Sequence, residues 1–207
     1  MPKREAPLEY LKKFIPEASA PLVLDYLHQY KVYLTITRQR KTVLGDYRHA
    51  VAGKNHRISV NGNMNPYAFL ITLIHELAHL VTFTEYGNRV QPHGREWKLV
   101  YRRMLEDFIQ LGIFPADILA AFKKNMHSLP ASSCADEELT RILKNHDARQ
   151  GKTVLVEQIA EGSLFNAGDG KVFRKGKKLR KRFQCIEIAT KRIYLFSPIF
   201  EVEPISE

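Results

Sequence analysis

The chain has 207 residues, and its 32 lysines and arginines against 22 acidic residues give a formal net charge of +10 at pH 7. With 44% hydrophobic and 26% charged residues, the composition is that of a globular protein and excludes a disordered, collagen-like or low-complexity chain. Two cysteines, Cys134 and Cys185, are too few for a disulfide-stapled scaffold or for a four-cysteine zinc ribbon.

The sequence gives no sign of a membrane or of export. Residues 1–7 lack the apolar core of a signal peptide. The most apolar stretch, residues 69–83, is too short to span a bilayer and contains three ionisable side chains. We therefore expect a cytoplasmic protein with no membrane partner.

The first sixty residues predict two helices followed by strands. Apolar residues recur at three- and four-residue steps over residues 7–14 and 18–30, with Pro16 between the two segments. Residues 32–37 are β-branched and aromatic, and residues 56–60 alternate, so both segments are predicted strands.

The clearest helix begins after Asn65, which is a good N-cap, and ends at Gly87. Its residues are apolar almost all the way round, so it should lie at the centre of the fold. Burial of the polar residues inside this helix, His75, Glu76 and His79, therefore needs a specific explanation.

An amphipathic helix is predicted over residues 94–111, and two more helices near 115–126 and 136–146. From Thr153 onward the composition favours a small antiparallel sheet or barrel of four or five strands. The expected core of this part is Phe165, Phe173, Phe183, Ile186, Ile188, Tyr194 and Phe196.

Residues 75–79 read His-Glu-Leu-Ala-His, an H-E-x-x-H motif on the predicted central helix. Two histidines four residues apart face the same side of a helix and can share one Zn²⁺ ion. Glu76 can hold a zinc-bound water, whose pKa the metal lowers toward ~7, and take its proton. A buried pair of hydrogen-bonded core histidines is the alternative, but unpaired ionisable groups in a core cost several kcal/mol.

A catalytic zinc ion usually has three protein ligands and an open fourth position. His93 follows the helix after a short loop and is the favoured third ligand. Glu96, one turn further on, is the alternative, whereas Glu85 fits a surface position at the helix end.

The H-E-x-x-H motif, followed by Pro92-His93-Gly94-Arg95-Glu96-Trp97, resembles the signature of the SprT-like metallopeptidase family. Residues 44–47 and 58–61 also resemble the glycine turn and strand that precede the active helix in this family, so the resemblance covers roughly residues 15–112. It implies one catalytic Zn²⁺ held by His75, His79 and His93, with Glu76 as catalytic base. Eukaryotic Spartan members of the family cut proteins crosslinked to DNA, and some bacterial members carry a tentative link to transcription elongation.

The resemblance implies a zincin-like helical metallopeptidase domain with a small antiparallel sheet. Together with the β-rich composition after Thr153, this predicts an α+β fold that ends in a small all-β module. We expect the metallopeptidase domain at residues 1–130, a helical linker at 131–150 and the basic β module at 151–207. Many family members end in a four-cysteine zinc ribbon that this chain lacks, so we expect no second, structural zinc ion.

Several residues are candidates for substrate binding. If the strand at residues 56–60 lies at a sheet edge, it could pair with an extended peptide; otherwise it is an ordinary core strand. Tyr86, Arg95 and Tyr101 are open candidates for stabilising the oxyanion. Trp97 is expected to pack beneath the site.

Residues 171–182 form a basic tract in which eight of twelve residues are Lys or Arg and none is acidic. Flanking Phe173 and Phe183 could stack on bases. A solvated hairpin is the alternative, but this charge density in a basic chain favours sequence-independent binding to the DNA backbone. The basic residues are Lys171, Arg174, Lys175, Lys177, Lys178, Arg180, Lys181 and Arg182.

The leading hypothesis is a zinc-dependent endopeptidase that acts on DNA-associated or DNA-crosslinked proteins. The alternative is a protein that binds nucleic acid or a transcription complex through a structural or weakly catalytic zinc site. A zinc hydrolase acting on a non-protein amide is the third possibility.

Overall fold

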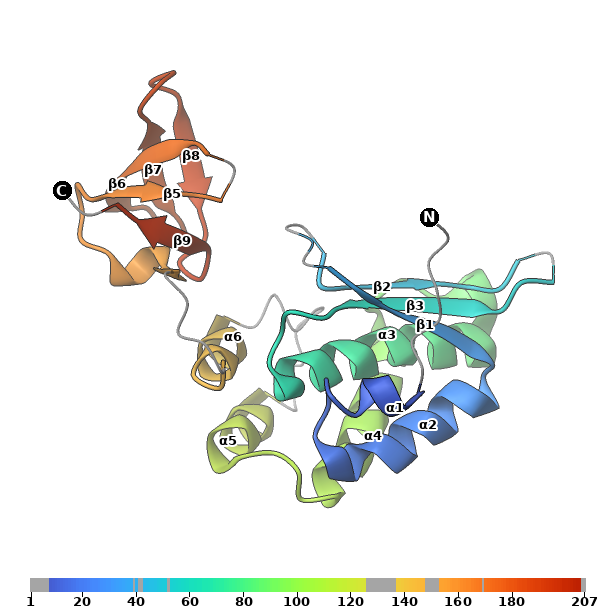
Figure 1. Cartoon of the computed structure of the whole chain (residues 1–207). Coiled ribbons are helices and arrows are strands. Elements are labelled where there is room, and N and C mark those ends of the chain that lie inside the picture. The colour runs from blue at the N-terminus through green and yellow to red at the C-terminus, as the bar shows by residue number, and fades with distance from the viewer. Residues whose placement is uncertain are drawn as a thin grey trace. The chain divides into compact units, whose positions relative to one another are not determined.

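The computed structural model describes residues 8–38, 40, 43–51, 53–125, 137–147, 153–168 and 170–205. The chain divides into two compact units, Met1–Asp147 and Ala148–Glu207 (Figure 1). The helix expected to be a linker belongs to the first unit, because it packs on the preceding helix. Cys134 lies outside the described residues.

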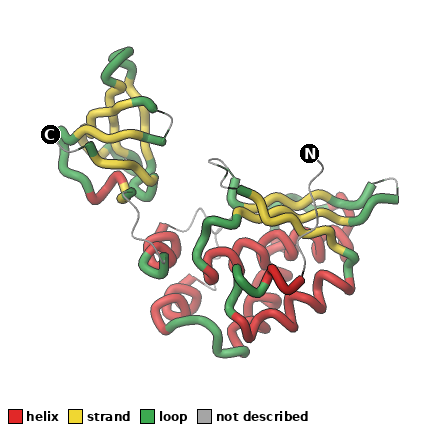
Figure 2. The backbone as a smooth tube through the Cα atoms, in the orientation of Figure 1, coloured by secondary structure: helices red, strands yellow, loops and turns green. Residues whose placement is uncertain are grey.

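The first unit contains six helices and three strands among its described residues. The helices are α1 (Leu8–Leu11), α2 (Ala20–Gln29), α3 (Pro66–Tyr86), α4 (Arg95–Gln110), α5 (Ala116–Asn125) and α6 (Glu137–Lys144). Short 3-10 turns lie at Glu17–Ser19 and Gly87–Arg89, and the strands are β1 (Val32–Thr37), β2 (Gly45–Arg48) and β3 (His56–Asn61). Figure 2 shows the strands lying on one side of the helices.

The three strands form a sheet in the order β1-β3-β2. Strand β2 is antiparallel to β3, but β1 runs parallel to β3, so the sheet is mixed rather than antiparallel as expected. Strand β3 is central, so of the two alternatives that the sequence left open, an edge strand and an ordinary core strand, the structure shows the second. Its backbone groups pair with β1 on one side and β2 on the other, and residues such as Ile58 and Val60 are buried. The edge near α3 is β2.

Helix α3 is the centre of the first unit, as its sequence predicts. The side chain of Asn65 accepts a hydrogen bond from the Ala68 N–H at 2.9 Å, and Pro66 occupies the first turn. The helix stops at Gly87, whose φ of +65° is a left-handed conformation that glycine adopts without a Cβ clash. The helix is long and apolar enough to cross a membrane, but 72% of its most apolar window is buried in the fold, as in a core helix.

The second unit is a six-stranded antiparallel sheet in the order β4-β9-β5-β6-β7-β8. Its elements are β4 (Val154–Leu155), a 3-10 turn (Val156–Gln158), β5 (Leu164–Asn166), β6 (Val172–Lys178), β7 (Phe183–Glu187), β8 (Ile193–Phe196) and β9 (Glu201–Pro204).

The core of the second unit contains four of the phenylalanines predicted for it: Phe165, Phe173, Phe183 and Phe196. Ile186 was expected there as well, but it is 39% exposed. The reason is strand alternation, because Cys185 and its alternate neighbours on β7 face inward and Ile186 faces outward.

Candidate metal centre

Three histidines converge in the first unit. The Nε2 atom of His75 lies 3.2 Å from Nε2 of His79 and 3.1 Å from Nε2 of His93. Two ligands of a tetrahedral zinc ion, each 2.0–2.1 Å from it, lie roughly 3.3 Å apart. These two distances fit a shared zinc ion, and one ligand atom from each of the three rings lies within 4.8 Å of the others.

Two of these ligands come from α3 and the third from a turn before α4. His75 and His79 are four residues apart on α3, so their rings face the same side. The turn is closed by the Gly94 N–H, which donates to the carbonyl of Gln91 at 2.9 Å. Pro92 fills its second position and His93 its third, where φ is +60°. A type II turn requires positive φ at this position and usually has glycine or asparagine there, so the chain accepts strain in order to place His93.

Trp97 forms the floor of the cluster. It is 1% exposed, and its ring lies 4.7 Å from those of His75 and His93 and 5.3 Å from that of His79. Tyr101 stacks on its other side at 4.9 Å. The expectation that Trp97 packs beneath the site is confirmed, and the aromatic floor limits water on this side of the histidines.

The histidines are held in their neutral form. Burial, followed by the neighbouring imidazoles, lowers the pKa of His75 to about 3. Burial and the proximity of His93 lower the pKa of His79 to about 4, and burial and Lys98 lower that of His93. Near pH 7 all three rings therefore present a lone pair, which is the form that binds metal.

The three neutral rings do not satisfy one another with hydrogen bonds. Nε2 of His75 is close to two other ring nitrogens at once, and a single nitrogen cannot both donate and accept. Its Nδ1 is buried with no hydrogen-bond partner among the described residues. A cation that accepts the lone pairs of the three Nε2 atoms resolves the conflict between these close nitrogens, whereas a purely structural histidine cluster leaves it in place.

Glu76 lies beside the cluster and is 7% exposed. Burial, followed by the charge of Asp46, raises its pKa to about 8, while Arg40 and a hydrogen bond from the backbone N–H of Tyr47 act in the opposite direction. A bound divalent cation would lower this pKa by attraction. Such a carboxyl group can exchange a proton near neutral pH, as a general base must.

Edge strand β2 holds Glu76 in place. A Cβ atom added at Gly45 would stand 2.5 Å from Oε1 of Glu76, so the strand can approach the carboxylate only because residue 45 is glycine. The resemblance in the sequence included this glycine, but the residues alone gave no sign that it touches the carboxylate.

Sequence reasoning missed Tyr47. Its ring is parallel to that of His79, with an interplanar angle of 2° and centroids 6.5 Å apart. Its hydroxyl lies 3.0 Å from Nδ1 of His56, and that nitrogen also accepts from the Ala50 N–H at 3.3 Å. The hydroxyl of Tyr47 therefore donates to His56. Strand β2 has four residues, too few for an alternation pattern to predict which side chain faces α3.

The other candidate ligands, Glu85 and Glu96, are not part of the histidine cluster. Glu85 forms a surface ion pair with Arg103 at 2.8 Å, and Glu96, in the first turn of α4, is outside the group of three histidines. Tyr86 is 41% exposed at the end of α3, and Arg95 is exposed at the start of α4.

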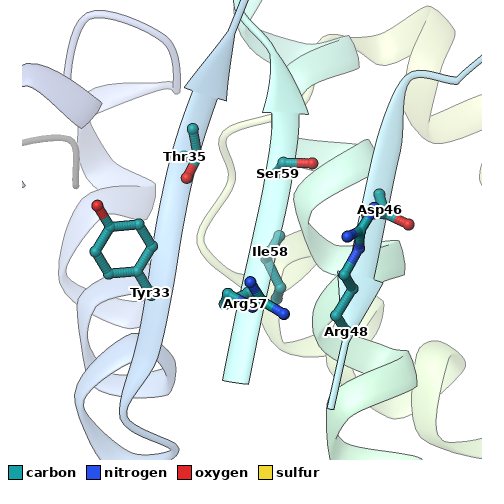
Figure 3. Close-up of a pocket in the computed structure, with 7 residues that line it drawn as sticks. All are labelled: Tyr33, Thr35, Asp46, Arg48, Arg57, Ile58 and Ser59. Atoms are coloured by element: carbon teal, nitrogen blue, oxygen red, sulfur yellow. The ribbon is translucent and has the colours of Figure 1, made fainter. Parts of the chain in front are cut away.

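A shallow cavity of about 300 Å³ lies over the sheet, with Tyr33, Asp46 and Arg57 among its lining residues (Figure 3). None of the three histidines lines it. Because strand side chains alternate, Gly45 and Tyr47 face α3, whereas Asp46 and its ion-pair partner face this cavity.

The basic tract, residues 171–182, covers β6 and the turn between β6 and β7. Lys175 is 5% exposed; its ammonium group bonds to the carbonyl of Ile159 and lies 4.2 Å from the ring of Phe183. Phe173 and Phe183 are core residues, so the expectation that they stack on bases is wrong. The exposed members of the tract are Lys171, Arg174, Lys177, Lys178, Arg180, Lys181 and Arg182.

Comparison with known proteins gives one consistent family. Residues 21–115 match the SprT-like family. Protein SprT of Pseudomonas fluorescens (strain Pf0-1) is 29% identical over 100 residues, which are 46% of this chain and 57% of that relative. Protein SprT of Vibrio parahaemolyticus is 60% identical over 35 residues, 16% of this chain and 21% of the relative. The chain thus spans between a fifth and somewhat over half of the length of these relatives, and no solved structure gives a significant match.

Proposed function

Residues 21–115 match the SprT-like family, and we propose that this chain is a zinc-dependent endopeptidase of that family. One observation carries the proposal: three histidine Nε2 atoms at the spacing of tetrahedral zinc ligands stand beside a buried carboxyl group. A structural zinc site needs a fourth protein ligand and has no use for a general base.

His75, His79 and His93 would hold the ion. When bound, zinc polarises the carbonyl of the scissile bond and acidifies a water molecule. Glu76 takes a proton from the attacking water on a carboxylate oxygen and later delivers it to the leaving amine. The aromatic floor under the histidines keeps solvent from that side of the reaction.

The proposed substrate is an extended peptide. Strand β2 ends the sheet on the side nearest the cluster, since its residues contact both Glu76 and His79. A peptide that pairs with the outer edge of β2 would place its backbone next to the proposed zinc ion. This role moves from β3, where the sequence first suggested it, to the strand at the edge.

The chain would reach DNA-associated or DNA-crosslinked proteins through the basic hairpin. Seven cationic side chains are exposed just before β6, on β6 and in the turn that follows it, and Lys175 is left out because it is buried. Contacts of this kind neutralise phosphates without reading sequence, and their affinity falls steeply with salt.

The peptidase proposal is tested with the full chain. Purified protein is expected to contain one zinc ion and to cleave casein, with and without single-stranded DNA. Glu76→Gln is expected to retain zinc and lose cleavage by at least 100-fold, because the substituted amide cannot accept the proton. Glu85→Gln, on the same helix but in a surface ion pair, is the matched control and should keep full activity.

Undiminished cleavage by Glu76→Gln would overturn the mechanism. Zinc-loaded parent protein with no cleavage would instead favour the alternative, a nucleic-acid or transcription-complex binding protein with a structural zinc site.

The DNA proposal is tested by a salt titration of oligonucleotide binding. Lys177→Glu, Lys178→Glu and Lys181→Glu together are expected to weaken binding at least 10-fold and to flatten the salt dependence. A control with the same change in charge replaces three exposed lysines of the first unit, Lys31, Lys54 and Lys123, by glutamate. Equal losses of DNA affinity in the two triple variants would show that the basic hairpin is not the DNA-binding surface.

A further inference from the structure

Three apolar side chains are exposed together on the outer face of the second unit. Ile193 is 61% exposed, Leu195 is 50% exposed and Ile186 is 39% exposed. Ile186 pairs directly with Ile193 across β7 and β8, and Leu195 is two residues along β8 on the same face. We refer to these three side chains as the β8 patch.

Strand β8 is also the last strand of its sheet. A strand at a sheet edge presents unpaired backbone groups, and proteins protect such edges with charged residues, proline or a bulge. The sequence of β8, Ile-Tyr-Leu-Phe, has neither a charged residue nor a proline, and the irregularity in this sheet lies between β6 and β7. An apolar, unprotected edge of this kind is suited to accept another strand.

The surroundings of the patch are positively charged. Arg174 pairs with Ile186 from β6 and is exposed, and the exposed side chains of Lys191 and Arg192 directly precede β8. The nearest acid in the turn, Glu187, is buried and accepts a hydrogen bond from Thr190. The patch therefore favours a partner that brings negative charge.

A second copy of this chain fits poorly. Pairing of two β8 strands would bring two sets of these cations together in a chain that already carries a formal charge of +10. The surface of three side chains is also far smaller than the ~800 Å² that each partner of a stable dimer usually buries. The occupant should be a short segment of a different protein.

We propose that β8 binds an extended segment of a partner protein by strand addition. Alternate side chains of that segment are apolar and cover Ile193 and Leu195, and acidic residues at one end meet Lys191 and Arg192. This surface is independent of the metal cluster and of the exposed lysines in the turn between β6 and β7. It gives the second unit a protein-binding role beyond the proposed contact with DNA.

The test uses the full chain and a labelled peptide of sequence Glu-Glu-Val-Thr-Val-Thr-Val-Thr, with binding followed by fluorescence anisotropy. A peptide that begins Lys-Lys instead of Glu-Glu is expected to bind at least 10-fold more weakly. A peptide with proline at two threonine positions is expected to lose binding to the same extent, because it cannot complete the backbone ladder.

Ile193→Thr together with Leu195→Thr should weaken binding of the acidic peptide at least 10-fold while keeping β-branched residues in the strand. The matched control is Leu179→Thr with Ile205→Thr, two other apolar residues of the second unit that are 41% and 40% exposed. Thermal melts of both double variants verify folding.

Three results would overturn the proposal. The first is equal affinity of the parent and the Ile193/Leu195 variant for the acidic peptide, including no binding by either. The second is a dimer of the parent chain in light scattering that the same variant dissociates, which would identify a second copy as the occupant. The third is a loss of affinity for a fifteen-nucleotide oligo-dT in the Ile193/Leu195 variant that equals its loss of affinity for the acidic peptide. This result would identify nucleic acid as the occupant.

Discussion

Gly45 lies so close to Glu76 that a Cβ atom at residue 45 would stand 2.5 Å from the carboxylate oxygen Oε1. Two residues along the same strand, the backbone N–H of Tyr47 donates to that carboxylate and its ring lies parallel to that of His79. Strand β2 therefore positions the proposed base and also borders the proposed zinc ligands. The edge strand and helix α3 together hold the residues proposed for catalysis.

The first prediction concerns this contact. Gly45→Ala should push the carboxylate out of position and lower kcat/KM for casein by at least 10-fold, because a displacement of about 1 Å of a catalytic group is costly. Zinc content should stay at that of the parent, since the three atoms nearest to a Cβ at residue 45 all belong to Glu76. Full activity of the Gly45→Ala protein would contradict the close packing.

The histidine cluster could be predicted from the sequence because helix geometry fixes the relation of His75 to His79, and a short loop limits where His93 can go. The position of Glu76 against β2 could not be predicted, because it depends on strand order. The sequence left open whether residues 56–60 form an edge strand or a core strand, whereas in the structure β3 is central and β2 is an edge.

In the second unit too, local sequence patterns predict some buried residues correctly and misassign others. Its phenylalanine core was predicted correctly, since large aromatic side chains in strands are usually buried. Ile186 was wrongly assigned to that core, and Lys175 was grouped with the exposed cations although it is buried. Both errors come from strand alternation: Phe173 and Lys175 lie on the inward face of β6, and Ile186 lies on the outward face of β7.

The second prediction concerns the turn that carries His93. Asparagine tolerates the positive φ at this position, so His93→Asn should leave the free energy of unfolding of the metal-free chain within ~0.5 kcal/mol of the parent. Zinc affinity should fall at least 100-fold, because one of three nitrogen ligands is lost. Urea titrations in chelator and competition with a zinc dye measure the two quantities. A large loss of stability without metal would show that His93 is a core residue rather than a ligand.

The third prediction concerns the pH dependence of the metal-free chain. The pKa values of His75 and His79 are about 3 and about 4 when folded, below the ordinary 6.5, so the unfolded chain binds more protons there and stability falls as pH drops below 6.5. The pKa of Glu76 is about 8 when folded, above the ordinary 4.5, so its contribution is lost as pH rises through 8. Between pH 4.5 and 6.5, the two histidines change the free energy of unfolding more than the single carboxyl group does. Above pH 6.5, only the carboxyl group changes it.

Urea midpoints of the chelated protein should therefore peak near pH 6.5 and decline on both sides. Glu76→Gln should remove the decline between pH 6.5 and 8 and keep the acid limb. Added zinc should stabilise the parent at neutral pH and lose its effect as the histidines become protonated. An alkaline limb that persists in Glu76→Gln would assign it to another group.

The last prediction concerns Asn65, which joins α6 to the start of α3. Its side-chain oxygen accepts from the Ala68 N–H, while its amide nitrogen donates to the carbonyl of Leu143 at 2.7 Å and to Asp147 at 2.8 Å. Asn65→Ala should cost about 1 kcal/mol for the lost N-cap and a further ~1–3 kcal/mol for the two lost hydrogen bonds to Leu143 and Asp147. The Leu143 carbonyl keeps the N–H of His146 as a donor. Asn65→Asp keeps the cap oxygen but removes the amide donor and faces Asp147 with a second carboxylate, so it should lose the contacts with residues 143 and 147 and add a like-charge repulsion. Urea denaturation followed by circular dichroism measures the free energy of unfolding of both variants. An Asn65→Asp protein as stable as the parent would show that Asn65 does not hold residues 137–147 against α3.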